Sequence, residues 1–401
     1  MPTNCSPSTD RQVMRERIDQ FCRREEGGMF RLLQDLVLQP SFSRFKQGVD
    51  AVGARLAASL ETSGMELETV RQSEFGDHLL FRTPACRDGR PALLLFGHMD
   101  TVFPLDSPFN WYKDQDGTVS GPGVIDMKGG LVAAVYTIKA LAECELLADI
   151  PLTLLCNSDE EIGSPSSTTI FQAEAGRSLA ALGFECGGLG GEVVTGRKGR
   201  SGYRLIVTGR AGHAASAGAD KASAILELAH KVIALEGLND PGRGIVVNVG
   251  VIDGGIGPNT VSDHAVAEID TRFLTRADAE ATAARMAGIA SHSTVAGTTA
   301  ALQYVGGRPP MEQNSRNSGL YQLIRAEADK LHLPCVEELR SGVSDANTIA
   351  QLDIPVVDGM GPIGDGDHSD REYMLRQSLP DRVRLAACSI LSIRERGFGS
   401  G

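Results

Sequence analysis

Short apolar runs alternate with a helical pattern between residues 65 and 198, and this alternation limits the fold more than any other feature of the chain. Continuous apolar runs bounded by turn residues are typical of buried strands. They cover Met65 to Val70, His78 to Phe81, Ala92 to Phe96, Leu152 to Cys156 and Leu179 to Phe184. Residues 127–146 instead repeat apolar positions every three to four residues, at Leu131, Val135, Ile138 and Leu141, which predicts an amphipathic helix. Strands that alternate with helices predict an open α/β sheet.

The pattern changes at about residue 200, where polar and apolar positions begin to alternate. Four such stretches, SGYRLIVTG, GIVVNVGVID, HAVAEIDTRF and ALQYVGG, are interrupted by helical patterns at 220–236 and 276–290. The order βαββαβ matches the ferredoxin-like split βαβ fold, an antiparallel sheet with helices on one face. The first helix has core spacing at Ile225, Leu228, Val232 and Leu235.

After residue 310 the α/β pattern resumes, with a helix at about 317–330, a strand near 354–357 and a closing helix at about 380–393. The fold class is therefore α/β, with a mixed, mostly parallel sheet flanked by helices and an inserted α+β domain. We expect a discontinuous larger domain, 1–198 and 311–401, interrupted by a smaller domain at 199–310. The length of 401 residues agrees with two domains, because a single hydrophobic core rarely grows that large.

Composition narrows the classes of partner. The net charge is −12 and the basic residues are scattered, so the sequence predicts no binding to nucleic acid or to an anionic membrane. No run of eighteen apolar residues occurs, and the first twenty residues lack a secretory core. The eight cysteines include no CxxC pair and are too sparse for a disulfide framework. We expect a soluble cytoplasmic protein with reduced thiols.

Histidines and carboxylates follow the ends of the expected strands and precede the expected helix. In an open α/β sheet, ligands collect at the carboxyl ends of the strands, and zinc prefers imidazole and carboxylate ligands. The residues are His98 and Asp100 in GHMDTV, Asp126 in GPGVIDMKGG, Glu160 and Glu161 in NSDEEIGS, Glu185 in GFECGG, and His368 in GDGDHSD. Asp126, Glu161, Glu185 and one bridging hydroxide would carry four negative charges. These balance the four positive charges of two zinc ions if both histidines are neutral. The set predicts a dinuclear zinc hydrolase.

The adjacent glutamates Glu160 and Glu161 need different roles, because neighbouring side chains in extended backbone point apart. One is expected to bind metal, and the other to take a proton from water and pass it to a leaving amine. We do not expect Asp100, two residues after His98, to bind the same metal. It is well placed to accept the second imidazole N–H and fix the tautomer.

These motifs, with GRAGHA and HSD, resemble the zinc-dependent metallopeptidase family that contains carboxypeptidase G, aminoacylase, acetylornithine deacetylase and succinyl-diaminopimelate desuccinylase. The similarity is greatest to the glutamate carboxypeptidase type. It implies two zinc ions per subunit, for which cobalt or manganese can substitute in part. It assigns His98 and Glu185 to one zinc, Glu161 and His368 to the other, Asp126 to both, and Glu160 to the general base. It also implies a cis peptide after Asp126.

The resemblance further implies that the inserted domain is a lid that forms a homodimer. His213 would stabilise the oxyanion, often in the partner's site, while Asn259 and Arg272 lie near substrate and Arg308 holds a substrate carboxylate. Glu192 departs from the family pattern, because glutamate-releasing members carry a basic residue there. From the residues themselves, Arg272 could equally face solvent or pair with Asp270, and the His213 imidazole could equally cap a strand end.

The implied activity is cleavage of a peptide or amide bond beside a free carboxylate, on a small peptide or an N-acyl amino acid. The alternatives are a deacylase of a small N-acetyl or N-succinyl amino acid, a dipeptidase, and a metal-binding regulatory protein without catalysis. The intact Glu160 argues against the last of these. The remaining histidines, among them His78, are expected to be ordinary core or surface residues. Asp345, in SGVSDANTIA, is expected to cap a helix, and the alternative is that it accepts a hydrogen bond behind the metal ligands.

Overall fold

The structure, a computed structural model, describes residues 7–218 and 220–396. It divides into two compact units: unit 1 comprises Met1–Gly196, Gln313–Leu339 and Ser344–Gly401, and unit 2 comprises Arg197–Glu312 with Arg340–Val343. The change in sequence pattern near residue 200 therefore lies at a unit boundary. The short return of the chain to unit 2 at residues 340–343 has no counterpart in the expected domain bounds.

A six-stranded sheet forms the centre of unit 1, in the order β1-β2-β6-β3-β7-β16. Its strands are β1 (Glu66–Val70), β2 (His78–Arg82), β3 (Ala92–His98), β6 (Leu152–Asn157), β7 (Ser178–Gly183) and β16 (Val356–Val357). The pairs β6/β3, β3/β7 and β7/β16 are parallel, while β1/β2 and β2/β6 are antiparallel. The expected mixed α/β sheet is confirmed.

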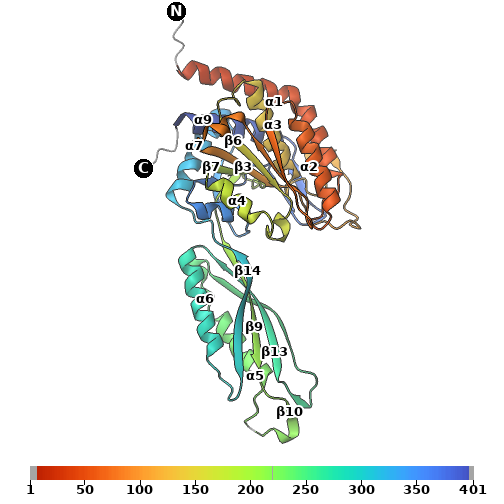
Figure 1. Cartoon of the computed structure of the whole chain (residues 1–401), viewed down its shortest axis with the longest axis vertical. Helices are drawn as coiled ribbons and strands as arrows, with labels where there is room; N and C mark the ends of the chain where they lie inside the picture. Colours follow the sequence, from red (N-terminus) through yellow and green to blue (C-terminus); the bar gives the residue numbers. More distant parts are fainter. Residues whose placement is uncertain (1–6, 219, 397–401) are drawn as a thin grey trace, which may run out of the picture. The chain divides into compact units, whose positions relative to one another are not determined.

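Helices cover both faces of this sheet (Figure 1). On one face α3 (Lys128–Glu143) packs with α1 (Pro7–Val37) and α9 (Ser378–Arg396), and α9 packs in turn with α7 (Ser315–Leu331). Alternate side chains of β3 point to opposite faces. Leu93 and Leu95 join the core that contains α3, whereas the Phe96 ring lies 6.0 Å from that of Phe171 in α4 (Thr168–Ala175).

Two features of unit 1 differ from the sequence expectations. The helix α3 is buried on nearly every side between Lys128 and Leu141, so it is a central helix rather than an amphipathic one. The sequence patterns also missed α1 and α2 (Lys46–Leu60) at the start of the chain. Short elements complete the unit: β4 (Lys113–Gln115), β5 (Thr118–Ser120), β8 (Glu192–Arg197), β15 (Val336–Arg340), α8 (Asp345–Ile349), β17 (Gly364–Asp365) and β18 (Tyr373–Leu375).

Unit 2 has the expected βαββαβ order. An antiparallel sheet in the order β11-β13-β9-β14 carries α5 (Ala224–Glu236) and α6 (Arg276–Ser291) on one face (Figure 1). Its strands are β9 (Gly199–Thr208), β11 (Val246–Gly254), β13 (His264–Phe273) and β14 (Thr299–Arg308), with the short pair β10 (Gly212–His213) and β12 (Thr260–Val261) beside them. Leu228 and Leu235 are buried as expected, but Ile225 is 47% exposed, so its place in the core was wrongly predicted.

Two expectations from composition can be compared with the structure. The described helices include none that is long and apolar enough to cross a membrane. Every cysteine from Cys22 onward is a free thiol, and Cys5 lies outside the described residues.

Candidate metal centre

Three of the candidate metal ligands, His98, Glu161 and Glu185, lie at or just after the carboxyl ends of neighbouring parallel strands. His98 is the last residue of β3 and lies opposite Asn157, the last residue of β6, so the turn with Glu160 and Glu161 follows directly. Glu185 comes two residues after the end of β7. Because β6, β3 and β7 are adjacent and parallel, all these side chains meet at one edge of the sheet.

The fourth candidate, Asp126, is brought to this edge by the close approach of α3. A Cβ on Gly130, in the first turn of α3, would come within 1.8 Å of the Phe184 carbonyl oxygen, so only glycine lets the helix start this near to the end of β7. The peptide between Asp126 and Met127 is cis, as expected. The backbone N–H of His98 donates to the Met127 sulfur at 3.2 Å.

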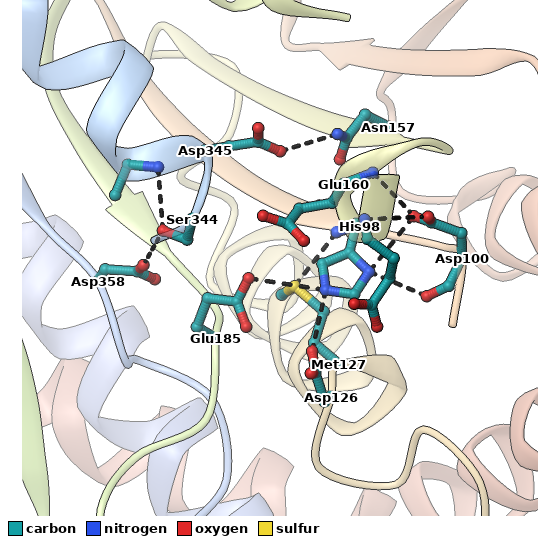
Figure 2. A network of polar contacts seen from close by, with 12 residues as sticks. His98, Asp100, Asp126, Met127, Asn157, Glu160, Glu185, Ser344, Asp345 and Asp358 are labelled. Carbon is teal, nitrogen blue, oxygen red and sulfur yellow. Dashed lines mark hydrogen bonds and ion pairs between the residues drawn. The ribbon is translucent and has the colours of Figure 1, made fainter. Parts of the chain in front are cut away.

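The side chains form two groups that share Asp126. The Asp126 Oδ1 lies 3.0 Å from His98 Nε2, which is also 3.6 Å from Glu185 Oε1. The Asp126 Oδ2 lies 3.0 Å from His368 Nε2, which is also 3.2 Å from Glu161 Oε2. Figure 2 shows the first group, with Asp126 and Glu185 both directed at the His98 ring. One carboxylate thus presents a different oxygen to each of two imidazole–carboxylate pairs.

The electrostatics of the cluster suit a bound cation. His98, Asp126 and Glu161 each place a possible ligand atom within 4.8 Å of the others. Among the described residues, the buried Glu161 Oε1 has no hydrogen-bond partner. Burial and the nearby Asp126 charge raise the pKa of both Glu161 and Glu185, and hydrogen bonds to Asp126 and Glu161 raise the pKa of His368 to about 11. Negative charge is concentrated here, and the donor set fits zinc.

Asp100 is fully buried and connects His98 to the turn after β6. The His98 Nδ1 lies 2.9 Å from the Asp100 backbone carbonyl oxygen and 3.4 Å from its Oδ1. The closer acceptor is therefore the backbone, not the carboxylate that the sequence suggested. The carboxylate accepts the backbone N–H groups of Glu160 and Glu161, both at 3.2 Å, and the Ser43 hydroxyl at 2.7 Å. Ser43 was missed, because it lies 57 positions earlier in the chain.

Glu160 and Glu161 start a short 3₁₀ turn, Glu160–Ile162, rather than continuing an extended strand. Their side chains nevertheless separate. Glu161 contacts His368, whereas the charge of Glu160 contributes to the raised pKa of Glu185 and so acts on the other group.

The remaining candidates belong to unit 2. His213 is exposed, and its Nδ1 accepts the backbone N–H of Ala215 at 3.2 Å. The β10/β12 ladder places it opposite Thr260, and the Ala214 N–H donates to the Asn259 carbonyl at 2.9 Å. The structure thus brings His213 and Asn259 together at one end of the unit.

Arg272 and Arg308 lie on either side of Arg200, because the register pairs Arg272 with Arg200 and Arg308 with Arg200. Directly opposed residues share a face of the sheet, so three arginines line one face. The Arg272 Nε donates to Asp270 Oδ1 at 2.8 Å, which bears out the simpler interpretation of this residue. Arg308 is only 7% exposed.

The side chain of Glu192, at the start of β8 in unit 1, is hydrogen-bonded within its own loop. Its carboxylate accepts the Gly190 backbone N–H at 2.7 Å and closes the loop before the strand.

Comparison with known proteins decides the family. The model of peptidase family M20/M25/M40 matches residues 94–392. The chain belongs to this family. It is 27% identical over 380 residues to carboxypeptidase G2 of Pseudomonas sp. (strain RS-16), which covers 92% of this chain and 90% of that protein. It is 33% identical over 202 residues to succinyl-diaminopimelate desuccinylase of Granulibacter bethesdensis, 46% of this chain and 49% of that protein.

Solved structures agree on the fold. Aminopeptidase PepT of Bacillus cereus is similar over 92% of this chain and 99% of its own, with a TM-score of 0.77 and 23% identity. An M20 family metallo-carboxypeptidase of Sulfolobus solfataricus is similar over 90% and 98%, with a TM-score of 0.70 and 17% identity. The chain is therefore a hydrolase of a metal-dependent peptidase family, as the sequence predicted.

Within this M20 hydrolase, a buried polar network supports the turn after β6. The Asn157 amide donates to Asp345 Oδ2 at 2.8 Å (Figure 2), and the Ser164 hydroxyl donates to Asp345 Oδ1 at 2.5 Å. Ser344, not Asp345, caps α8, in a capping box with Asn347. Of the two roles considered for Asp345, capping is therefore wrong, because its carboxylate accepts hydrogen bonds that join α8 to the end of β6 and to Ser164.

A second buried group lies behind Asp126. Glu372 accepts backbone N–H groups of the turn before α3, and Lys128 is buried nearby. Burial raises the pKa of Glu372 to about 8, although its backbone hydrogen bonds act in the opposite direction. Burial likewise lowers the pKa of Lys128 to about 7 against the Glu372 charge. Neither residue had a recognisable sequence signal, because the partners of Glu372 are backbone groups some 246 positions away.

Proposed function

We propose that this protein is a dizinc hydrolase that cleaves a peptide or amide bond next to a free carboxylate. The observation that carries the proposal is Asp126, whose two oxygens each face a separate imidazole–carboxylate pair 3.0 Å away. A bridging carboxylate with separate terminal ligands is the arrangement that two-metal hydrolases require. His98 and Glu185 would hold one ion, and Glu161 and His368 the other.

Two zinc ions, or cobalt or manganese in their place, would supply Lewis acidity toward the scissile carbonyl and would make water more acidic. The protein's own residues perform the proton transfers. We assign the general base to Glu160, whose carboxylate takes a proton from the attacking water and donates it to the leaving nitrogen. Asp100 supports this role, because it holds the Glu160 backbone N–H at 3.2 Å and so fixes the start of the turn.

Unit 2 would complete the reaction. His213 is proposed to donate a hydrogen bond to the developing oxyanion, with its free ring nitrogen, since Nδ1 already accepts the Ala215 N–H. Asn259 adjoins it and would bind the substrate near the scissile bond. We assign the substrate carboxylate to Arg308, because a guanidinium can bind both oxygens of a carboxylate. Arg272, two strands away on the same face, would lie near the substrate.

We also propose that unit 2 forms a homodimer through α5 and β11. Ile225, Ile233 and Ile252 are 47%, 74% and 64% exposed, and together with Leu228 and Val232 they line an apolar hollow of about 550 Å³. The strand β11 is at the edge of its sheet, with backbone groups available for pairing. An exposed apolar surface beside a free strand edge suits a self-complementary contact with a second copy.

The alternative is a deacylase of a small N-acetyl or N-succinyl amino acid, which would use the same chemistry. Glu192 supports this alternative, because a carboxylate in place of the basic residue of glutamate-releasing members gives no positive charge to bind a terminal glutamate side chain. The likeness to a desuccinylase over 202 residues also favours it.

Hydrolysis of dipeptides and N-acyl amino acids by zinc-loaded protein tests the proposal. Each substrate is compared with the same molecule carrying an amidated carboxyl end. We expect hydrolysis of the free acids and a large loss of kcat/KM on amidation. Equal rates on both forms would refute the carboxylate clamp at Arg308, and no hydrolysis of any amide would refute the function.

A further inference from the structure

Glu372 is a buried carboxylate outside the candidate ligand set, and it binds the turn that carries Asp126. Its side chain is fully buried. Oε2 accepts the Gly123 backbone N–H at 2.9 Å, and Oε1 accepts those of Ile125 and Asp126 at 2.7 and 3.0 Å. Both oxygens are therefore used, and three backbone donors depend on one side chain, two of them in fully buried hydrogen bonds.

The same residue belongs to the hairpin that carries His368. The strands β17 and β18 pair as Gly364 with Met374 and Asp365 with Tyr373, and their connecting loop contains both His368 and Glu372. His368 has a φ of 58°, within a tight turn, and the Glu372 N–H donates to Ser369 O at 3.3 Å. Glu372 is thus at the base of a loop whose far end presents the imidazole.

The surrounding strands hold this hairpin next to the Asp126 turn. β18 pairs with β5, which ends at Ser120, directly before the turn at residues 121–127. Glu372 links the hairpin directly to Asp126, because its carboxylate accepts the Asp126 backbone N–H. The Asp126 carboxylate in turn lies 3.0 Å from His368 Nε2.

An amide or an apolar side chain at position 372 could not accept all three backbone N–H groups. A buried carboxylate is costly unless it is well hydrogen-bonded, and here three backbone N–H groups donate to it. A glutamine would retain one acceptor oxygen and would turn an NH₂ group toward a backbone N–H. At least one donor would then lose its partner, and the turn would have to shift.

We propose that Glu372 is a positioning residue that fixes the Asp126 turn to the His368 hairpin, so that Asp126 keeps one oxygen on each side of the metal centre. This inference rests on the proposed two-metal function. It predicts that Glu372 controls metal affinity although it contacts no metal.

The test is a zinc titration of the full-length apo protein and its variants, followed by calorimetry, with the visible spectrum of the cobalt(II) form as a second readout. We expect Glu372→Gln to weaken at least one of the two zinc equivalents by about ten-fold to a hundred-fold, the usual effect of losing a partner behind a ligand. The cobalt spectrum should change with it. Glu372→Asp keeps both oxygens and should recover part of the affinity.

Glu227→Gln is the matched control. Glu227 is also buried, at 1% exposure, and also accepts backbone N–H groups, those of Thr294 and Val295, but it lies in unit 2. Its substitution should lower thermal stability and leave zinc affinity and the cobalt spectrum unchanged.

The outcomes separate the two proposals. A folded Glu372→Gln with wild-type zinc affinity and cobalt spectrum would overturn the positioning role alone. If Glu372→Gln does not fold, Glu372→Asp decides: weakened zinc binding in a folded protein supports the role, and wild-type binding or failure to fold overturns it. A wild-type protein that binds no zinc would refute the proposed function, and the inference with it.

Discussion

The fold holds His98 and Asp100 of unit 1 more firmly than His213 and Asn259 of unit 2. In unit 1, His98 is 1% exposed and both of its ring nitrogens have partners, while Asp100 accepts backbone groups from the neighbouring turn. In unit 2, His213 and Asn259 are exposed on short strands and turns. Preorganised side chains suit metal binding, where small errors in geometry are costly. Exposed ones suit groups that act only when a substrate or a second subunit arrives.

This comparison gives a rule for the effects of substitution. Changes near Asp126 in unit 1 should alter metal binding. Changes at the exposed residues of unit 2 should alter catalysis and leave metal content and stability intact. Glu160 is the exception in unit 1, because it is not assigned to a metal, and its substitution should alter catalysis rather than metal binding.

Glu160→Gln should have the largest effect on turnover. The amide cannot accept the proton of the attacking water, so we expect kcat to fall by about 10²–10⁴-fold while both zinc ions stay bound. Steady-state kinetics with metal analysis of the same sample checks this. Near-normal turnover with metal retained would show that another group is the base.

His213→Ala should lower kcat by roughly 10²–10³-fold, the usual cost of losing one oxyanion donor. Zinc content and melting temperature should not change, because the side chain is exposed and its hydrogen bond to the Ala215 N–H lies within its own turn. Loss of zinc in this variant would break the division between the two units.

Ile233→Asp should dissociate the proposed dimer. Ile233 is 74% exposed, so the charged residue disturbs no core and should leave the melting curve of unit 2 nearly unchanged. Sedimentation at several concentrations reports the oligomeric state. If His213 acts in the partner's site, the monomer should lose as much activity as His213→Ala, and a fully active monomer would rule out that delivery.

His78→Gln should have the smallest effect, which appears only in the pH dependence of stability. His78 is fully buried between Ser158 and Ser166, and burial lowers its pKa below the usual 6.5. The unfolded chain therefore binds this proton more readily, so the contribution is present above pH 6.5 and is lost as the pH falls below it. The stability difference between wild type and variant should shrink from pH 7 to pH 5. A constant difference would contradict the neutral state of His78.

The sequence predicted the parts of the site that follow from strand ends. His98, Asp126, Glu161 and Glu185 stand after apolar runs or before a helix, and the carboxyl ends of parallel strands meet at one edge of a sheet. His368 instead lies in the loop between β17 and β18, and its assignment rests on the family resemblance. Ser43 and Glu372 could not be found in this way. Their partners are a distant carboxylate and three backbone N–H groups, and neither kind of contact leaves a spacing pattern.

The periodicity of apolar residues identifies helices, but it does not predict which residues of a helix are buried. In α1, Ile18, Phe21, Cys22, Met29 and Leu33 are buried at helical spacing, a signal that the charged composition of the segment obscured. In α5, Ile225 has the same spacing as Leu228 yet remains 47% exposed. Spacing identifies the apolar face of a helix, but it does not tell whether the same chain covers all of that face.

The most direct test of the two-metal assignment is anomalous diffraction at the zinc edge from crystals of the zinc-loaded protein. Two peaks are predicted, one bound by Asp126 Oδ1 with His98 and Glu185, and the other by Asp126 Oδ2 with Glu161 and His368. A single peak, or two peaks that do not share Asp126, would contradict the assignment.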